Sequence, residues 1–440
     1  MKNFSLFIVM AAFLASCTDS ESMHEPSVHD SKSLEAALKP FRTPEDAVEV
    51  AMKAIDMLSD VSPESRGNIP RHIDSNTPLR IISSSSKSRS GVSMRDTLMY
   101  VVNYADSMGF ALVSAVPNTP ELIAVTVSGV YNPDESCDNP GFNMYIEDIT
   151  TFLSQQLLSF EPAIDPDKPP FKPVPQYKEV RDTTWFDKID NRIRVYWGQS
   201  SPEGWECPND RAGCSNTAVA MLMSYFEHPK RLTLTYKENG SILNIDWAGL
   251  KRHNAMGKTY NDVIESNCYS YEIHKSLAEL CRELGKRSGS TYLTIPKRET
   301  PTPISGTIKT LRDLGYSVSD MQSYVAGQVA DILRNSNSVL LMYGADTAND
   351  AGAHLWVCDA VKRYKVHTTV YERNSFMLEG VWKYVEERDE YFQYNFYNWG
   401  WGAYQSELSG YFWSDNFTIY DNHEIKYNFN SNVSYIKVML

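Results

Sequence analysis

Apolar residues recur at helical spacing just after residue 40. In the segment PEDAVEVAMKAIDML, residues 44–58, they return every three or four positions and so line one side of a helix. Thr43 is suited to cap the N-terminus, Pro44 to the first helical position, and Glu45 and Asp46 to the positive end of the dipole. The pattern predicts a helix beginning at Pro44 whose apolar stripe consists of Ala47, Val50, Ala51, Ala54, Ile55 and Leu58.

Three apolar runs after this helix have the composition of β-strands. They are TLMYVVNYA at 97–105, GFALVSAV at 109–116 and LIAVTVSGVY at 122–131, and the first two are separated by a turn at Met108-Gly109. The segment MYIEDITTFLSQQLL, residues 144–158, then predicts a second helix. Together these elements indicate a small α+β domain.

Proline frequency and loss of periodicity mark a boundary near residue 160. The stretch FEPAIDPDKPPFKPVPQYKEV, residues 160–180, holds six prolines, which is typical of an extended, accessible linker. We therefore expect a signal segment at 1–16, a polar tether at 17–40, a first domain at 41–160, a linker at 161–184 and a larger second domain at 185–440.

The N-terminus has the layout of a signal peptide. Lys2 precedes an apolar run from Phe4 to Leu14, which is too short to cross a bilayer comfortably, and small residues follow. The sequence Leu-Ala-Ser-Cys, ending at Cys17, resembles the bacterial lipobox, whose cysteine becomes the first mature residue and carries acyl chains. We expect lipidation at Cys17 and an extracytoplasmic position on a bacterial membrane, at the outer membrane or cell surface. The alternative is a plain secretory signal with an incidental cysteine.

Composition and charge exclude several classes of function. A length of 440 residues suffices for two or three domains, and a formal net charge of −13 without a basic block argues against nucleic acid as a partner. None of the seven cysteines forms a C-x-x-C pair, so we expect no structural metal and no cofactor. With Cys17 lipidated and Cys214 free, five cysteines remain, which excludes a complete disulfide framework.

The candidate nucleophile is Cys214, in RAGCSNTAVAMLMSYFEHP. A helical pattern follows it until His228-Pro229, so the thiol belongs to the first helical turn. Exposed N–H groups and the helix dipole there favour a thiolate. We expect His228 to terminate this helix rather than to act as a base.

The candidate base is His354, which opens the predicted strand HLWVCDAV and lies 140 residues after Cys214. This separation falls in the range of about 130–150 residues typical of papain-like enzymes. The remaining histidines singled out, in polar surroundings, are expected at the surface: His253, His274, His367 and His423.

Two further segments offer supporting groups. In NWGWG, Asn398 and Trp399 are suited to orient an imidazole and to shield it from water. Upstream, the amide of Gln199 is suited to donate to a developing oxyanion, with the backbone N–H of Cys214 as second donor. A plain loop role for Gln199 is the alternative.

Taken in order, these motifs resemble the streptopain family of papain-like cysteine peptidases. GCSNTAVAMLMSYFEHP is similar to its nucleophile helix, GAHLWVCDAV to its histidine strand and NWGWGAYQSELSGYF to its Trp-rich turn. NIDWAGL, LRDLGYS and ILRNSNSVLLMYG are similar to further family segments. GFALVSAVPNTPELIAVTVSGVY resembles part of the family's inhibitory propeptide.

The resemblance implies an α+β fold, with a papain-like peptidase domain preceded by a small α+β propeptide domain that acts as an intramolecular inhibitor. It further implies hydrolysis of protein or peptide substrates, with Cys214 as nucleophile and His354 as general acid/base. Asn398 or Trp399 orients the imidazole, and Gln199 belongs to the oxyanion hole.

The chain departs from the family pattern at Ala353, at Leu355-Trp356, at Ser215-Asn216 and at Met221. Cys207 is also close in sequence to the nucleophile, and either forms a regulatory disulfide with it or is a buried thiol. Two alternatives to a peptidase therefore stay open, a catalytically silent surface binding protein and an acyltransferase that uses the same Cys-His chemistry.

Overall fold

A computed structural model of the chain describes fifteen ranges of residues. They are 41–58, 71–73, 79–83, 96–159, 176–200, 202–252, 271–294, 298–335, 337–345, 353–373, 381–402, 408–414, 418–421, 424–428 and 433–440. The predicted signal segment, Cys17 and the tether lie outside the described residues, as do His253, His423 and most of the predicted linker.

The N-terminal module runs from α2 to α3 and follows the sequence pattern closely. Thr43 caps α2 (Pro44–Ala54) in a reciprocal capping box with Asp46, which confirms the predicted helix start. The predicted strands are β2 (Thr97–Asn103), β3 (Phe110–Ser114) and β4 (Leu122–Thr126), and the second predicted helix is α3 (Pro140–Ser159). Two 3-10 turns (Ile55–Leu58 and Ala105–Ser107) and β1 (Arg80–Ser83) complete the module.

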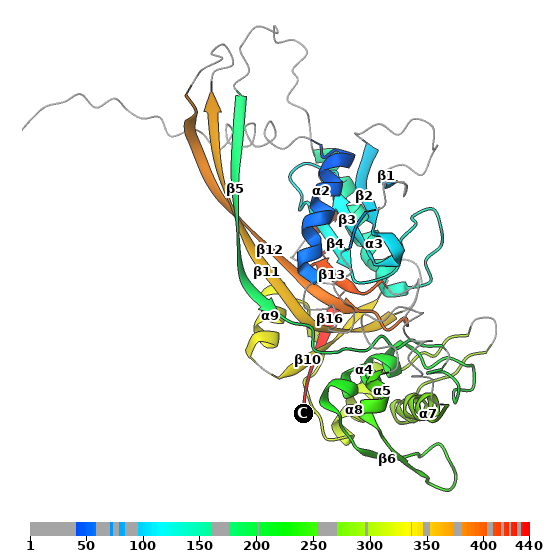
Figure 1. The fold of residues 1–440 in the computed structure, drawn as a ribbon. Coiled ribbons are helices and arrows are strands. Elements are labelled where there is room, and N and C mark those ends of the chain that lie inside the picture. The colour runs from blue at the N-terminus through cyan, green and yellow to red at the C-terminus, as the bar shows by residue number, and fades with distance from the viewer. Residues whose placement is uncertain are drawn as a thin grey trace, which may run out of the picture.

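The C-terminal module runs from β5 to β16. Its helices gather at the end of the molecule away from α2 and α3 (Figure 1): α4 (Cys214–Phe226), α5 (Trp247–Arg252), α7 (Tyr271–Ser288) and α8 (Ile304–Asp313). A further helix, α9 (Ala326–Asn335), lies beside the sheet. The strands of the module are β5 (Gln176–Ile189), β6 (Arg231–Thr233), β7 (Ile242–Asn244), β8 (Ser317–Val318), β9 (Gln322–Ser323), β10 (Ser338–Ala345), β11 (Ala353–Arg373), β12 (Lys383–Asn398), β13 (Gly410–Trp413), β14 (Thr418–Asp421), β15 (Glu424–Asn428) and β16 (Val433–Met439).

One antiparallel sheet of twelve strands joins the two modules. Its order is β1-β2-β3-β4-β13-β12-β11-β10-β16-β8, with β5 added to β11 and β9 to β16. The junction is the pairing of β4 with β13, where Ala124 faces Phe412. A Cβ at Gly410 would lie 2.2 Å from the carbonyl oxygen of Val125, so only glycine permits this close approach. The α+β organisation expected from the sequence is thus confirmed.

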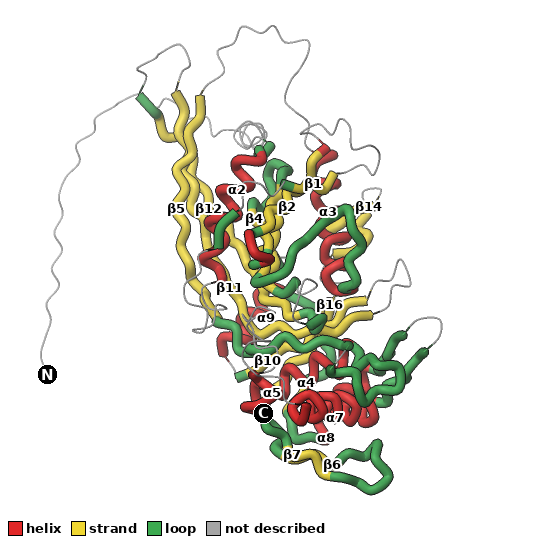
Figure 2. Tube along the Cα trace, turned by 45° about the vertical axis from the view of Figure 1, so that its right-hand side comes forward, coloured by secondary structure: helices red, strands yellow, loops and turns green. Residues whose placement is uncertain are grey.

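Strand β11 extends far beyond the predicted strand at 354–361 and ends at Arg373. Its first residues pair with β10, and its distal half pairs with β5 on the same edge. With β12 these strands form an arm that leaves the body of the molecule (Figure 2). Residues 176–184, which we expected in the linker, therefore belong to β5, because β11 offers their backbone groups a ladder once the prolines end at Pro175.

Alternate residues of β11 face two different apolar clusters. Trp356 and Cys358 belong to the cluster that contains the core of the N-terminal module, whereas Leu355 and Val357 pack with α4. The N-terminal module therefore shares an apolar core with one face of the sheet, while α4 covers the other face.

His274 corrects one sequence expectation. It was expected at the surface, but only 5% of it is exposed on α7, with its ring edge-on to Trp205 at 5.5 Å. Trp205, which is distant in the sequence, packs on this part of α7 and buries the imidazole. His367 is partly exposed and bonds to Asp389 at 2.7 Å. Within the described ranges, no helix has the length and apolarity needed to span a membrane.

Candidate active site

Cys214 is the first residue of α4, as the sequence predicts. Gly213 precedes it with a φ of 88°, in the region that favours glycine, and a Cβ there would lie 2.9 Å from the carbonyl oxygen of Thr300. The Gly213 carbonyl accepts the N–H of Thr217 at 3.0 Å and so starts the helix. The thiol therefore lies at the positive end of a buried helix.

His354, at the start of β11, meets the Cys214 thiol. Burial raises the pKa of Cys214, but a hydrogen bond and positive charge from His354 act in the opposite direction. The backbone of Leu355 and the side chain of Ser215 also lower this pKa, and the balance lies below the ordinary value. The thiol and the imidazole, 140 residues apart in the sequence, thus form a pair in which the thiolate is favoured.

The backbone of Trp399 orients the imidazole of His354. Nε2 of His354 lies 2.9 Å from the Trp399 carbonyl oxygen, and because that oxygen only accepts, Nε2 carries the proton. Nδ1 is then the nitrogen left to face the sulfur. His354 is 4% exposed, and the rings of Trp356 and Trp401 lie 6.1 and 5.9 Å from its own. Indole rings thus flank the imidazole and limit its contact with bulk solvent.

The side-chain amide of Asn398 bonds to two backbone groups. Its Nδ2 donates to the Val195 carbonyl at 2.8 Å, and its Oδ1 accepts the N–H of Gly400 at 3.3 Å. The amide therefore holds the turn that carries the Trp399 carbonyl. Of the two residues predicted to orient the base, the structure brings Trp399 to it directly and Asn398 only through this turn.

Gln199 lies beside the first turn of α4. Its carbonyl accepts the N–H of Ala212 at 2.7 Å, and the carbonyl of Gly198 accepts Oγ1 of Thr217 at 2.9 Å. Within the described part of the chain, the buried Nε2 of Gln199 has no hydrogen-bond partner. A buried donor without a partner is costly in a folded protein, and this one is suited to an incoming oxyanion.

Cys207 is a buried free thiol, and Cys214 is free as well. Burial raises the pKa of Cys207 to about 11, against opposing effects from Tyr292 and Arg282. Of the two roles considered for Cys207, the structure has it as a buried thiol.

The N-terminal end of α3 packs directly against this site. A Cβ on Gly141 would lie 2.6 Å from Cδ2 of His354 and 2.6 Å from Cε3 of Trp399. One helical turn later, Cε of Met144 would lie 2.3 Å from a Cβ on Gly344, the residue paired with His354 across β10 and β11. The N-terminal module therefore covers the base side of the Cys-His pair.

Sequence reasoning did not identify three participants in this site. They are the backbone carbonyl of Trp399, the backbone of Leu355, and Gly141, which packs closely against His354 and Trp399. Carbonyl groups occur at every residue, so no sequence pattern marks the one that meets the base. No group of three metal-ligating side chains occurs in the described ranges.

A comparison with protein families agrees with this chemistry. Residues 194–412, which contain Gln199, Cys214, His354 and Asn398, match the family described as the Peptidase C10 family. Two solved structures from Prevotella intermedia are similar. A prointerpain A fragment with a cysteine-to-alanine mutation has 18% identity and a TM-score of 0.47, covering 82% of this chain and 98% of its own. The active interpain A cysteine protease has 17% identity and a TM-score of 0.35. The match covers 57% of this chain and 94% of the protease. No curated protein matches the chain.

Proposed function

Residues 194–412 form a cysteine peptidase domain of the Peptidase C10 family, and from this premise we propose that the protein is a secreted, lipid-anchored zymogen of a cysteine endopeptidase. The observation that carries the proposal is the contact between the Cys214 thiol and the His354 imidazole at the N-terminus of α4. Peptide bonds of proteins are the substrates, and the N-terminal module is the inhibitor.

The first half of the reaction forms a thioester. The Cys214 thiolate attacks the scissile carbonyl carbon, and the carbonyl oxygen becomes an oxyanion. Nε2 of Gln199 and the N–H of Cys214 donate to that oxyanion, and one such donor is typically worth about 3 kcal/mol of barrier. The protonated His354 then gives its Nδ1 proton to the leaving amine as the C–N bond breaks.

The second half returns the enzyme to its starting state. His354 takes a proton from water, whose oxygen attacks the thioester carbonyl. Collapse of the second tetrahedral intermediate releases the carboxylic acid and the Cys214 thiolate. The Trp399 carbonyl keeps Nε2 protonated throughout, so that proton transfer occurs at Nδ1.

Inhibition by the N-terminal module is supported by its position. The start of α3 lies against His354 and Trp399, where a substrate would have to approach the base. Pairing of β4 with β13 and a shared apolar core hold the module in place.

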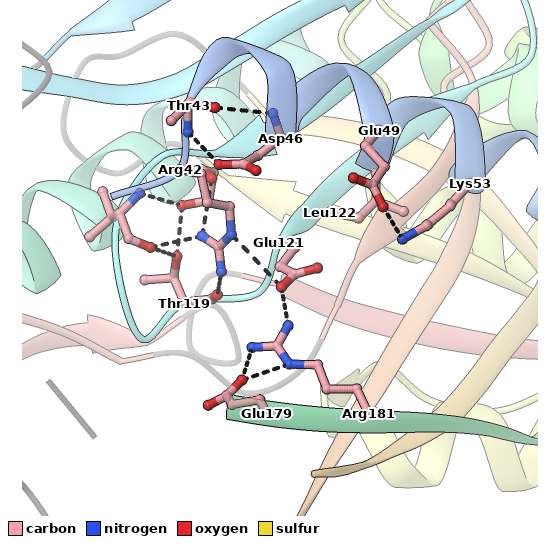
Figure 3. Close-up of polar contacts among 12 residues, drawn as sticks. Arg42, Thr43, Asp46, Glu49, Lys53, Thr119, Glu121, Leu122, Glu179 and Arg181 are labelled. Carbon is pink, nitrogen blue, oxygen red and sulfur yellow. Dashed lines mark hydrogen bonds and ion pairs between the residues drawn. The ribbon is translucent and has the colours of Figure 1, made fainter. Parts of the chain in front are cut away.

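An ion-pair chain links the module to the arm (Figure 3). Arg42 bonds to the carbonyls of Ser114, Val116 and Thr119, and its Nε lies 4.0 Å from Glu121. Glu121 in turn pairs with Arg181 of β5. Arg181 follows the Pro-rich stretch, so cleavage in that stretch would leave Glu121 and Arg181 on different fragments. This makes the stretch after Ser159 the expected site of activation cleavage.

Location rests on the N-terminal sequence. Acylation at Cys17 with two or more chains anchors a protein stably, and the polar tether would hold the peptidase outside the membrane of a bacterial cell. Radiolabelled palmitate incorporation in a bacterial host tests this part, with Cys17→Ala as the control. Label that persists in the variant would refute lipidation at Cys17.

The activity is tested by incubating the purified chain with fluorescein-labelled casein under reducing conditions. We expect hydrolysis and a new N-terminus between residues 160 and 176, and neither with Cys214→Ala. An amine acceptor in the assay separates the outcomes: acceptor-linked products would indicate an acyltransferase. Absence of both hydrolysis and transfer, together with no selective alkylation of Cys214, would indicate a silent binding protein.

A further inference from the structure

A buried carboxylate lies in the turn that carries the oxyanion donor. Only 2% of Glu203 is exposed, and its Oε1 accepts the backbone N–H of Gly198 at 3.1 Å. The turn closes through the N–H of Gly204, which lies 2.6 Å from the carbonyl oxygen of Ser200. A Cβ on Gly204 would lie 2.3 Å from the carbonyl oxygen of Asp210, so the turn is packed tightly against the following loop.

Three hydrogen bonds hold the backbone of Gly198 and Gln199. Two of them, from Thr217 and Ala212, tie the two carbonyls to the nucleophile helix and the residues just before it. The third is the bond from the Gly198 N–H to Glu203, which is the only one of the three that involves an ionisable side chain. The carboxylate thus fixes the N–H of Gly198, the residue directly before Gln199.

The surroundings of Glu203 shift the ionisation of its carboxyl group to near neutral pH. Burial raises the pKa of Glu203 to about 7, while the backbone N–H groups of Glu203 and Gly198 oppose this shift. On α7, the Cys281 thiol is coupled electrostatically to Glu203, and burial keeps that thiol protonated. The bond to Gly198 is charge-assisted when Glu203 is ionised, and weaker when it is protonated.

We propose that Glu203 is a positioning residue for the oxyanion hole. Its carboxylate fixes Gly198 and thereby the side-chain amide of Gln199. The inference rests on the proposed peptidase function. It adds that turnover depends on the ionisation of a group that is bonded to the backbone of Gly198. In the ionised state the Gln199 amide is held for the oxyanion, and protonation of Glu203 loosens it.

The test compares two reactions of the full chain under reducing conditions. Hydrolysis of labelled casein needs both thiolate and oxyanion hole, whereas alkylation of Cys214 by iodoacetamide passes through no oxyanion. We expect Glu203→Ala to lower kcat by about tenfold or more, less than loss of the donor itself, and to leave the alkylation rate and KM nearly unchanged. The matched control is Glu206→Gln, in the same loop, whose carboxylate bonds instead to the Tyr236 hydroxyl.

Two further measurements separate positioning from a merely structural role. In a Gln199→Ala background, Glu203→Ala should have little additional effect, because the donor that it positions is already absent. Glu203→Gln keeps an acceptor oxygen but does not titrate. It should fold like the wild type and lack the rise in kcat that we expect of the wild type as pH passes about 7.

The outcomes distinguish the two levels of inference. Equal losses of hydrolysis and alkylation, full additivity with Gln199→Ala, or an unchanged pH profile in Glu203→Gln would each overturn the role of Glu203 while leaving the peptidase intact. A wild-type chain that neither hydrolyses casein nor reacts selectively at Cys214 would overturn the proposed function, and with it the basis of this inference.

Discussion

Nε2 of His354 lies 2.9 Å from the carbonyl oxygen of Trp399, so a backbone atom orients the base. A carbonyl fixes the tautomer as firmly as a side-chain amide, because it accepts a hydrogen bond but cannot donate one. Its position depends on the turn after β12, which Asn398 and the glycines at 400 and 402 shape. The geometry of the base is therefore a property of the whole turn.

Asn398→Ala should impair this turn rather than remove a catalytic group. The substitution leaves the buried Val195 carbonyl without its donor, which costs about 1–3 kcal/mol of unfolding free energy. Activity should fall partially as the Trp399 carbonyl moves. Urea unfolding and casein hydrolysis measure both effects. Complete loss of activity at unchanged stability would instead indicate that the amide itself acts on the imidazole.

The reactivity of Cys214 should depend on His354. Because the imidazole lowers the thiol pKa, iodoacetamide should alkylate wild-type Cys214 with a midpoint below that of an ordinary free cysteine. His354→Ala removes the largest effect that opposes burial of the thiol and should move the midpoint upward. Alkylation rates across pH 5 to 10, with the modified site identified by mass spectrometry, provide the measurement. An unchanged midpoint in His354→Ala would show that His354 does not lower the pKa of the Cys214 thiol.

Gly141 should set how closely the N-terminal module covers the site. A valine there would place atoms within 3 Å of His354 and Trp399 and push the start of α3 outward. We expect faster alkylation of Cys214 in the uncleaved chain and faster maturation. Gly327→Ala on α9 is the control, since nothing lies within 4 Å of its added Cβ. Unchanged alkylation in Gly141→Val would show that α3 does not limit access.

The link between Glu121 and Arg181 should weaken in acid. Burial raises the pKa of Glu121, but Arg42 and Arg181 lower it by more than burial raises it. The pKa of Glu121 in the folded chain therefore lies below 4.5. A depressed pKa contributes stability above pH 4.5, and that stability is lost as pH falls through the folded value. Both side chains are partly exposed, so the pair contributes at most about 1 kcal/mol. Glu121→Gln should abolish the pH dependence of module release, measured by size-exclusion chromatography of the cleaved chain.

Glu203 should produce the opposite dependence of stability on pH. Its folded pKa of about 7 exceeds its ordinary value of 4.5, so the folded chain retains a proton that the unfolded chain has lost between these values. The free energy of unfolding then decreases as pH rises from 4.5 to 7, by roughly 3 kcal/mol at most. Glu203→Gln should remove this decrease. Chemical denaturation at pH 5 and pH 8 checks the sign, and a larger decrease in the variant would contradict it.

Features that depend on neighbouring residues could be predicted from the sequence. The capping box at Thr43, the apolar stripe of α2, the strands β2 to β4 and the position of Cys214 at a helix start all depend on neighbouring residues. Side chains a few positions apart determine such features, because helix caps and strand periodicity involve short stretches of backbone. The pairing of Cys214 with His354 was also expected, from residue type and spacing.

Contacts between residues far apart in the sequence determined the features that the sequence did not predict. The strand β5 exists because the distal half of β11 offers it a ladder, and His274 is buried because Trp205 packs on it. Asn398 turns to Val195, over two hundred positions away, rather than to the adjacent base. Hydrogen-bonding groups in a folded chain take whichever partner the topology brings near, and the sequence of a segment does not contain that topology.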